Sequence, residues 1–256
     1  MSYASLEVLF SPADFAALKG RDLSSAVAVV FDVLRATSSI VTALAHGAEA
    51  VIPVQEIEQA NSLAREEPAY LLAGERHGLR LLAHQTGQRD FDLGNSPREF
   101  QPEIVAGRTI VMTTTNGTRA LQACSHARAV LVGSFLNLTA TARALSQAPA
   151  EQLLLVCGGT FEELAYEDVL GAGALAELLG EQAPLSDSAL IARQIWRGAE
   201  SDLLAALALS RNGRHLLGQP ALAQDVAYCA QIDRFPVVGR MRAGRAESSR
   251  PGASLT

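Results

Sequence analysis

The segment Val27–Ala45, VAVVFDVLRATSSIVTALA, constrains the fold of this chain more than any other. Its first residues form an uninterrupted apolar run, which is typical of a strand buried on both faces of a parallel sheet. Apolar residues then recur at helical spacing after Thr37 and Ser38, either of which is placed to cap a helix. A buried strand that leads through a short polar turn into a helix predicts a βα unit of an α/β fold.

The turn of this unit carries Asp32 and Arg35. Ligands of open α/β sheets bind outside the carboxyl ends of the strands, and the N-terminus of a helix favours negative charge. A carboxylate and an arginine at this position therefore indicate an anion site or a metal–anion site. The alternative is a capped turn with a surface Asp–Arg pair, and this segment alone does not decide between the two.

The rest of the chain repeats the pattern of the first unit. Short apolar segments alternate with helical segments of about ten residues, which predicts right-handed βαβ crossovers. We therefore expect a three-layer α/β/α fold with a mainly parallel or mixed central sheet. The C-terminal third is predicted to be helical, with helices at Ser186–Arg197, Ser201–Leu209 and Ala221–Ala230.

The domain organisation follows from the same pattern. We expect residues 1–239 to form a single α/β domain, which could consist of two lobes, with Val237–Val238 as an edge strand. Residues 240–256 are polar, contain Gly and Pro, and lack apolar periodicity, so they are expected to form a disordered tail.

Composition narrows the classes of protein. The net charge of −6 argues against nucleic acid as a partner, because a surface that binds phosphate backbones needs clustered positive charge. Lys19 is the single lysine, so guanidinium groups must supply nearly all positive charge for any bound anion. The three cysteines suggest neither a disulfide framework nor a zinc site. No targeting or membrane-spanning segment is evident, so a cytoplasmic location without a membrane partner is expected.

A second polar turn follows the predicted strand Arg108–Met112. It contains Thr114, Thr115, Asn116 and Gly117 and leads into another helix. Small residues at a helix N-terminus let backbone N–H groups approach an anion, so this segment predicts an oxyanion nest. The alternative is simple capping, for which one residue suffices.

Acidic residues follow two further strands. Glu75 and Arg76 stand directly after the predicted strand Ala69–Ala73, and Glu167 and Asp168 open a later helix. Carboxylates are hard oxygen ligands for a divalent cation, but acids in the first turn of a helix also complement its dipole. From spacing alone, the dipole interpretation of Glu167 and Asp168 is favoured.

Together these turns indicate a site for a phosphate with Mg²⁺, if a parallel sheet brings the strand ends together. Mg²⁺ takes one or two carboxylates with substrate oxygens and waters. Other templates fit poorly. The chain has neither a GxxxxGK[ST] P-loop nor a GxGxxG after its first strand. Leu34 occupies the position of the second aspartate in haloacid-dehalogenase phosphatases, which argues against an aspartyl-phosphate mechanism of that kind.

Five ordered motifs resemble the 2-phosphosulfolactate phosphatase (ComB-like) family. They are FDVLRATSSIVTAL, AGERHG, FDLGNSP, TTTNGTRAL and CGGTFEELAYEDVLGAG. The resemblance implies a Mg²⁺-dependent phosphatase with an α/β/α fold. Its named reaction converts (R)-2-phospho-3-sulfolactate to 3-sulfolactate and phosphate, on the route to coenzyme M.

Guided by these motifs, we assign roles to the candidate site residues. Asp32, Glu75 and Asp168 are expected at or near the metal, with Glu167 as the next candidate. The predicted phosphate-binding residues are Thr114, Thr115, Asn116 and Gly117. Arg35 and Arg76 would bind the sulfonate or carboxylate, or stabilise charge in the transition state, and Asn95 is a further candidate for substrate binding. The predicted catalytic residues are Asp32, Arg35 and Arg76.

Several alternatives remain open from the sequence. A non-catalytic binding protein for a small phospho- or sulfo-acid could use the same nest and arginines without Mg²⁺. A phosphatase that acts on a different small phospho-acid is a second alternative. An oxidoreductase is less favoured because the glycine fingerprint is missing. A homodimer is possible through the helical C-terminal third.

Overall fold

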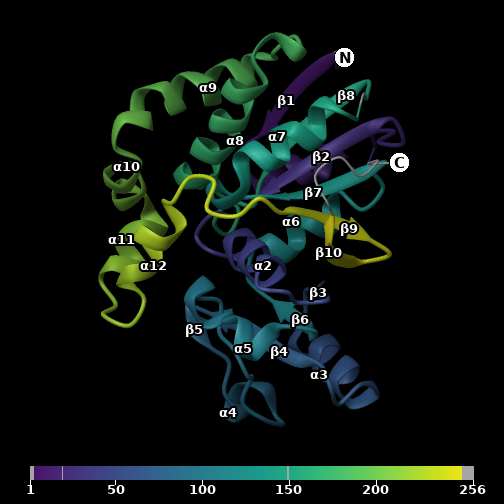
Figure 1. Ribbon diagram of the computed structural model, residues 1–256, viewed down its shortest axis with the longest axis vertical. Coiled ribbons are helices and arrows are strands. Elements are labelled where there is room, and N and C mark those ends of the chain that lie inside the picture. Colours follow the sequence, from purple (N-terminus) through teal and green to yellow (C-terminus); the bar gives the residue numbers. More distant parts are fainter. Residues whose placement is uncertain (1–2, 19, 149, 250–256) are drawn as a thin grey trace.

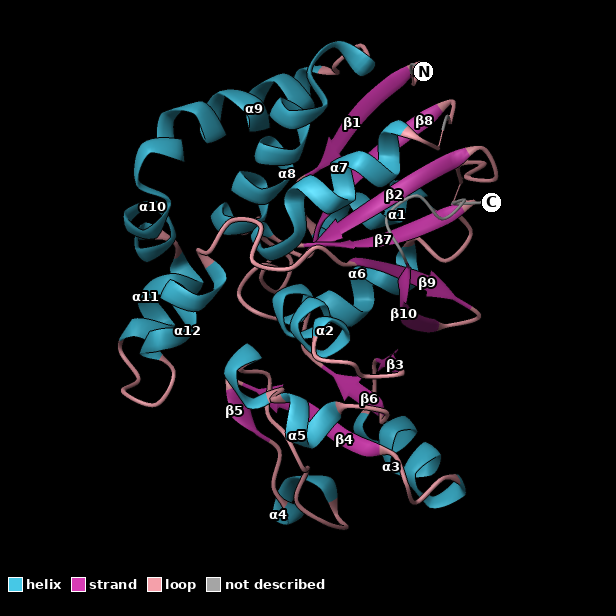
Figure 2. Ribbon diagram, in the orientation of Figure 1, coloured by secondary structure: helices cyan, strands magenta, loops and turns pink. Residues whose placement is uncertain are grey.

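The computed structural model describes residues 3–18, 20–148 and 150–249. In these residues, ten strands form one mixed sheet in the order β1-β8-β2-β7-β9-β10-β3-β6-β4-β5. Helices cover both faces of the sheet, as Figures 1 and 2 show. The predicted three-layer α/β/α architecture is therefore confirmed.

The strands begin with β1 (Ser5–Leu9), β2 (Ala26–Phe31), β3 (Ala50–Val54), β4 (Leu71–Arg76) and β5 (Leu79–Arg80). The later strands are β6 (Thr109–Thr113), β7 (Ala129–Gly133), β8 (Gln152–Cys157), β9 (Val238–Arg242) and β10 (Arg245–Ser249).

The helices of the first half are α1 (Phe15–Leu18), α2 (Ala36–Ala45), α3 (Ile57–Glu66), α4 (Ala83–Thr86), α5 (Pro102–Val105) and α6 (Gly117–Ala123). Those of the second half are α7 (Leu138–Ser146), α8 (Tyr166–Leu179), α9 (Asp187–Ala199), α10 (Leu203–Leu209), α11 (Arg211–Leu217) and α12 (Ala223–Cys229). Within the described part of the chain, no helix has the length and apolar character needed to cross a membrane.

Strand β2 is the buried centre that its sequence predicts. Val27, Val29 and Phe31 pack into a core that also contains side chains of α7, α8 and α9. Ala28 and Val30 alternate with them and join a second core with side chains of α2 and α6. Successive side chains of a strand point to opposite faces, so a strand covered by helices on both sides must be apolar throughout.

The sheet consists of two parallel halves. Strands β1, β8, β2 and β7 are parallel neighbours, and β3, β6 and β4 form the second parallel set. The C-terminal hairpin β9–β10 joins the halves, because β9 pairs antiparallel with β7 and β10 pairs antiparallel with β3. Figure 2 shows strands of both halves running toward the same side of the molecule, beside α2. Twist accumulates from strand to strand, so two halves separated by the hairpin can converge there.

The hairpin corrects two predictions about the C-terminus. Val238 belongs to a strand inside the sheet and not at its edge, and residues 240–249 are ordered rather than part of a disordered tail. Backbone pairing with two neighbouring strands stabilises this segment, although only Val238, Gly239, Arg240 and Ala246 are buried. Polar composition alone is therefore misleading here. The remaining residues of the predicted tail, 250–256, lie outside the described residues.

The helical C-terminal third is confirmed, with one addition. Helices α9, α10 and α12 lie where the sequence places them, and α11 is a further helix that the periodicity did not reveal. The hydroxyl of Ser210 accepts a hydrogen bond from the backbone N–H of Gly213 and caps α11. This short helix matters because it forms one wall of the pocket described below.

We predict that Ala246→Asp destabilises the protein by roughly 3 kcal/mol or more, because it buries an unpaired carboxylate between β9 and β3. Ala246 is fully buried and faces Val51 of β3. Chemical unfolding followed by circular dichroism measures the loss. Ser248→Asp is the matched control, because Ser248 is an exposed residue of the same strand. Equal stability of the two variants would show that the hairpin is not part of the folded sheet.

Candidate active site

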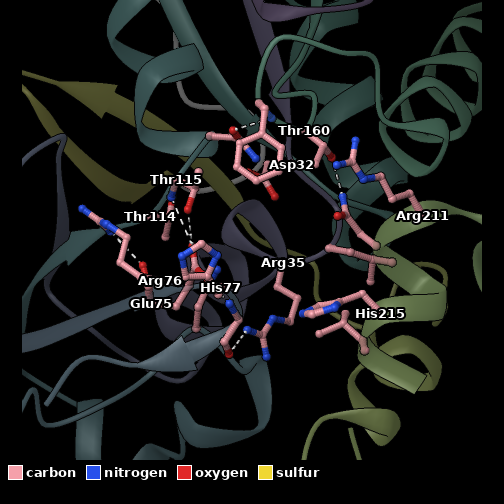
Figure 3. A pocket seen from close by; sticks show the side chains of 17 residues that line it. Asp32, Arg35, Glu75, Arg76, His77, Thr114, Thr115, Thr160, Arg211 and His215 are labelled. Carbon is pink, nitrogen blue, oxygen red and sulfur yellow. Dashed lines mark hydrogen bonds between the residues drawn. The ribbon is translucent and has the colours of Figure 1, made fainter. Parts of the chain in front are cut away.

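A pocket of about 360 Å³ lies at the carboxyl ends of strands from both halves of the sheet. This volume is in the range of small-molecule sites. Residues after β2, β4, β6 and β8 line it, together with residues of α11 (Figure 3). Its polar lining consists of Asp32, Arg35, Glu75, Arg76, His77, Asn95, Thr114, Thr115, Asn116, Thr160, Arg211, Asn212 and His215.

Asp32 is held at the start of helix α2. Its Oδ1 accepts a hydrogen bond of 3.1 Å from the backbone N–H of Ala36, while Thr37 bonds the backbone of Asp32. The expected cap at Thr37 or Ser38 is thus replaced by the aspartate itself, because the helix already begins at Ala36. The fixed backbone orients the carboxylate toward the pocket that it lines.

Gly117 allows α6 to approach Asp32. A Cβ atom at this glycine would lie 2.8 Å from Oδ2 of Asp32 and 2.6 Å from Cβ of Ala36. Gly117 does not line the pocket. The structure therefore gives it a packing role beside Asp32, where the sequence predicted phosphate binding.

The pKa of Asp32 is raised from 3.8 to about 7. Burial is the main cause, because the charged carboxylate loses its hydration. The negative charges of Glu167 and Glu75 raise this pKa further, whereas the hydrogen bond from Ala36 and the positive charge of Arg35 lower it. Carboxyl groups whose charges oppose one another in a pocket are typical of functional sites.

Glu75 joins the ends of β4 and β6. Its Oε1 accepts hydrogen bonds from the backbone N–H (3.1 Å) and the hydroxyl (3.0 Å) of Thr115, and its Oε2 accepts one of 2.7 Å from the N–H of Gly78. The donors of Thr115, which the sequence assigned to a phosphate, are thus bound to a carboxylate of the protein itself.

Glu167 and Asp168 are neighbours in the sequence but differ in their hydrogen-bond partners. Both oxygens of Asp168 accept backbone N–H groups, from Val33 at 2.8 Å and Gly159 at 3.0 Å, and tie the end of β2 to the end of β8. Glu167 accepts a 2.6 Å bond from Asn212 at Oε1, but its buried Oε2 has no hydrogen-bond partner among the described residues. Burial raises the pKa of both groups.

These carboxylates have the chemistry of a magnesium site without forming a closed cage. Across the described ranges, no group of three or more His, Cys, Asp or Glu side chains is arranged to hold a metal ion. Mg²⁺ commonly uses one or two carboxylates and takes its other ligands from water and substrate. The bare Oε2 of Glu167 and the raised pKa of Asp32 indicate an excess of negative charge that a cation would relieve. Asp32 and Glu75, which line the pocket, therefore fit the ion. Glu167 and Asp168 are buried outside the pocket lining, and both oxygens of Asp168 accept backbone donors.

Arg35 and Arg76 both line the pocket but differ in their partners. Arg35 is buried and forms a 2.7 Å ion pair with Asp225, which is itself fully buried, and it also donates to the carbonyl of Gly78 at 2.8 Å. Arg76 donates to neutral oxygens, the carbonyl of Glu75 at 2.7 Å and the hydroxyl of Thr113 at 3.2 Å. Arg76 is thus better able to share its positive charge with a ligand.

The other predicted substrate-binding residues lie around the same pocket. Thr114, Asn116 and Asn95 line it, and the buried Oγ1 of Thr114 and Oδ1 of Asn95 have no hydrogen-bond partner within the described part of the chain. The Oδ1 of Asn116 accepts a bond from the N–H of Phe161. Unpartnered buried polar atoms in a pocket wall are expected where a ligand completes the hydrogen bonding.

Sequence reasoning missed five polar residues of the pocket, His77, Thr160, Arg211, Asn212 and His215. His77 and Thr160 lay within the quoted motifs, but their side chains carried no recognisable spacing. The other three project from α11. Ser210 before a polar seven-residue segment is a helix-start signal that could have revealed this helix.

The fold and the site define an α/β/α protein with a polar pocket for a small anion at the carboxyl ends of its strands. Comparison with known proteins refines this class. The family described as 2-phosphosulpholactate phosphatase matches residues 15–244. The chain therefore belongs to this family of phosphatases, as its motifs suggested.

Three relatives illustrate the similarity, and each is named "Probable 2-phosphosulfolactate phosphatase". The protein of Caldanaerobacter subterraneus subsp. tengcongensis is 37% identical over 238 residues, which cover 91% of this chain and 94% of that protein. The relative from Carboxydothermus hydrogenoformans is 37% identical over 251 residues, 96% and 98% of the two chains. The relative from Synechococcus sp. is 41% identical over 219 residues, 83% and 87% of the two chains.

We predict that Asp32→Asn stabilises the protein at alkaline pH. Since the pKa of Asp32 is raised to about 7, the folded protein binds this proton more tightly than the unfolded chain does. That stability is fully present below about pH 4 and is lost as the pH rises through about 7. In EDTA, the melting temperature of the unmodified protein should fall more steeply between about pH 5 and pH 8 than that of the variant, with a gap of several degrees at the upper end. Parallel curves would contradict the raised pKa.

Proposed function

We propose that this protein is a Mg²⁺-dependent phosphomonoester hydrolase that converts (R)-2-phospho-3-sulfolactate to 3-sulfolactate and phosphate. The observation that carries the proposal is that negatively and positively charged side chains face one another in one pocket. The buried carboxylates of Asp32, whose pKa is raised, and of Glu75 face guanidinium groups across a space for a small ligand. The names of the relatives support the choice of substrate.

Asp32 and Glu75 are the residues that would hold Mg²⁺, with Glu167 as the next candidate. When bound, the ion neutralises phosphoryl oxygens and lowers the pKa of a water molecule. The chain prepares these three groups by fixing two of them on backbone donors and the third on Asn212. Preorganisation of this kind avoids reorganisation during the reaction.

The other pocket residues position the phosphoryl group. Arg76 offers a guanidinium whose observed partners are neutral oxygens, and the hydroxyl of Thr114 offers a free hydrogen-bonding group beside it. Charge-assisted hydrogen bonds from arginine to phosphate are strong and directional. In the hydrolysis, water forms a new bond to phosphorus, the ester P–O bond breaks, and the alcohol oxygen takes a proton as 3-sulfolactate leaves.

Arg35 has a structural role in the pocket wall, because its guanidinium is already engaged by a carboxylate of the protein. Its guanidinium is paired with Asp225, which also accepts hydrogen bonds from Ser96 and Arg98, both at 2.7 Å. This buried cluster ties the loop that carries Asn95 to helix α12. We therefore assign Arg35 to shaping the pocket wall and lowering the pKa of Asp32, and assign direct contact with the phosphoryl group to Arg76.

Phosphate release from 2-phosphosulfolactate and from 2-phospholactate tests the proposal. We expect turnover that requires Mg²⁺, is abolished by EDTA and prefers the sulfonate. Mg²⁺-dependent release from other phospho-acids alone would retain the phosphatase and reassign its substrate. Binding of the acid without release under any condition would instead identify a non-catalytic binding protein, and the proposal would be wrong.

We predict that Asp32→Asn lowers kcat at least 100-fold, because removal of one charged ligand from such a site typically costs about 3 kcal/mol or more. Asp22→Asn is the matched control, since Asp22 is exposed and lies outside the pocket. The melting curves described above verify that the Asp32 variant is folded. Turnover within a few fold of the unmodified protein would remove Asp32 from the mechanism.

A further inference from the structure

Among the described residues, three arginines line the pocket, and they differ in how much charge they can offer a ligand. The buried carboxylate of Asp225 forms ion pairs with Arg35 and with Arg98, whereas the observed partners of Arg76 are neutral oxygens. Arg211 pairs with Glu163 at 2.7 Å, but the side chains are 54% and 75% exposed. Exposed pairs of this kind contribute little free energy, so a ligand can displace Glu163 at small cost.

The turn that follows Gly159 holds Arg211 in place. The guanidinium lies over the ring of Phe161, 5.4 Å from its centroid. Thr160 and Glu163 exchange two backbone hydrogen bonds, and the N–H of Phe161 donates to Asn116. The turn is thus fixed to the segment that follows β6. An aromatic face below an arginine orients it while leaving its N–H edges available for an oxyanion.

Arg76 and Arg211 lie on opposite walls of the pocket. Figure 3 shows Arg76 beside Glu75 on one side and Arg211 on α11 on the other, with Asp32 above and between them. Cations on two walls match a ligand with two separate anionic groups better than a simple phosphate ester.

We propose that Arg211 is the specificity-determining residue that binds a second anionic group of the substrate, the sulfonate, and that Glu163 occupies it in the free protein. This inference rests on the proposed function and deepens it. On binding, the sulfonate replaces the carboxylate of Glu163 on the guanidinium, while the phosphoryl group lies toward Arg76 and Asp32. Replacement of the carboxylate by the sulfonate leaves the net charge at Arg211 unchanged. The gain in binding free energy comes from the more enclosed position of the ligand, where electrostatic attraction is stronger.

The test compares Arg211→Met with Arg214→Met, a control on the exposed side of the same helix and outside the pocket. With 2-phosphosulfolactate, Arg211→Met should raise KM by roughly 10- to 100-fold and change kcat by less than about threefold, as expected for loss of a charged hydrogen bond. With 2-phospholactate, which lacks the sulfonate, the same variant should behave like the control. An equal loss with both substrates would overturn the assignment.

Glu163→Gln provides the opposite change. Removal of the competing carboxylate should lower KM for 2-phosphosulfolactate by about two- to fivefold, the range expected for an exposed ion pair. It should leave KM for 2-phospholactate unchanged. A higher KM for the sulfonate substrate would show that Glu163 supports binding, contrary to the proposal.

Equilibrium binding separates this inference from the proposed function. If Arg211 recognises a sulfonate, 3-sulfolactate should bind more tightly than lactate by calorimetry, and Arg211→Met should remove the difference. This outcome can hold even if no phosphate ester is hydrolysed, in which case only the proposed function fails. Hydrolysis of phosphate esters with equal binding of the two acids would retain the phosphatase and reject the role of Arg211.

Discussion

The burial of four carboxylates at the carboxyl ends of the strands is the constraint on which the site depends. Ionised carboxylates lose much of their hydration in such a position, so each must be paired, hydrogen-bonded or partly protonated. Backbone N–H groups after β2, β4, β6 and β8 provide most of the compensation, through Asp32, Glu75 and Asp168. The same bonds fix the strand ends relative to one another. The hydrogen bonds that stabilise the buried carboxylates therefore also determine the shape of the pocket.

The C-terminal hairpin gives the pocket its two opposed walls. It places β9 and β10 between two parallel half-sheets, so that groups from β4 and β6 face groups from β2 and β8. Helix α11 adds a wall that carries Arg211, Asn212 and His215. A ligand in this pocket meets carboxylates from the sheet and guanidinium groups from two sides, which is the arrangement expected for a small molecule with more than one anionic group.

The central part of the fold was predictable because it follows local periodicity. Strand β2 is apolar at every position since both of its faces are covered, and the βα units after it repeat that logic. The hairpin was not predictable in this way, because its strands are stabilised by backbone pairing and mostly bear polar side chains. At the site, Asp32, Glu75, Arg76 and Thr114 were found from their position after strands. The residues of α11 were not, since they reach the pocket from a helix remote in sequence.

The sequence by itself determined the α/β/α class, the family and the strand ends at which the polar residues gather, because apolar periodicity and turn chemistry are local properties of the chain. Only the tertiary structure decided which of these polar groups remain available to a ligand. Asp168 and Thr115 are engaged by partners within the protein, and Asp225 forms an ion pair with Arg35 across 190 positions of sequence. Such long-range pairing leaves no local pattern, so the availability of Arg76 and Arg211 to a ligand could be recognised only once the chain was folded.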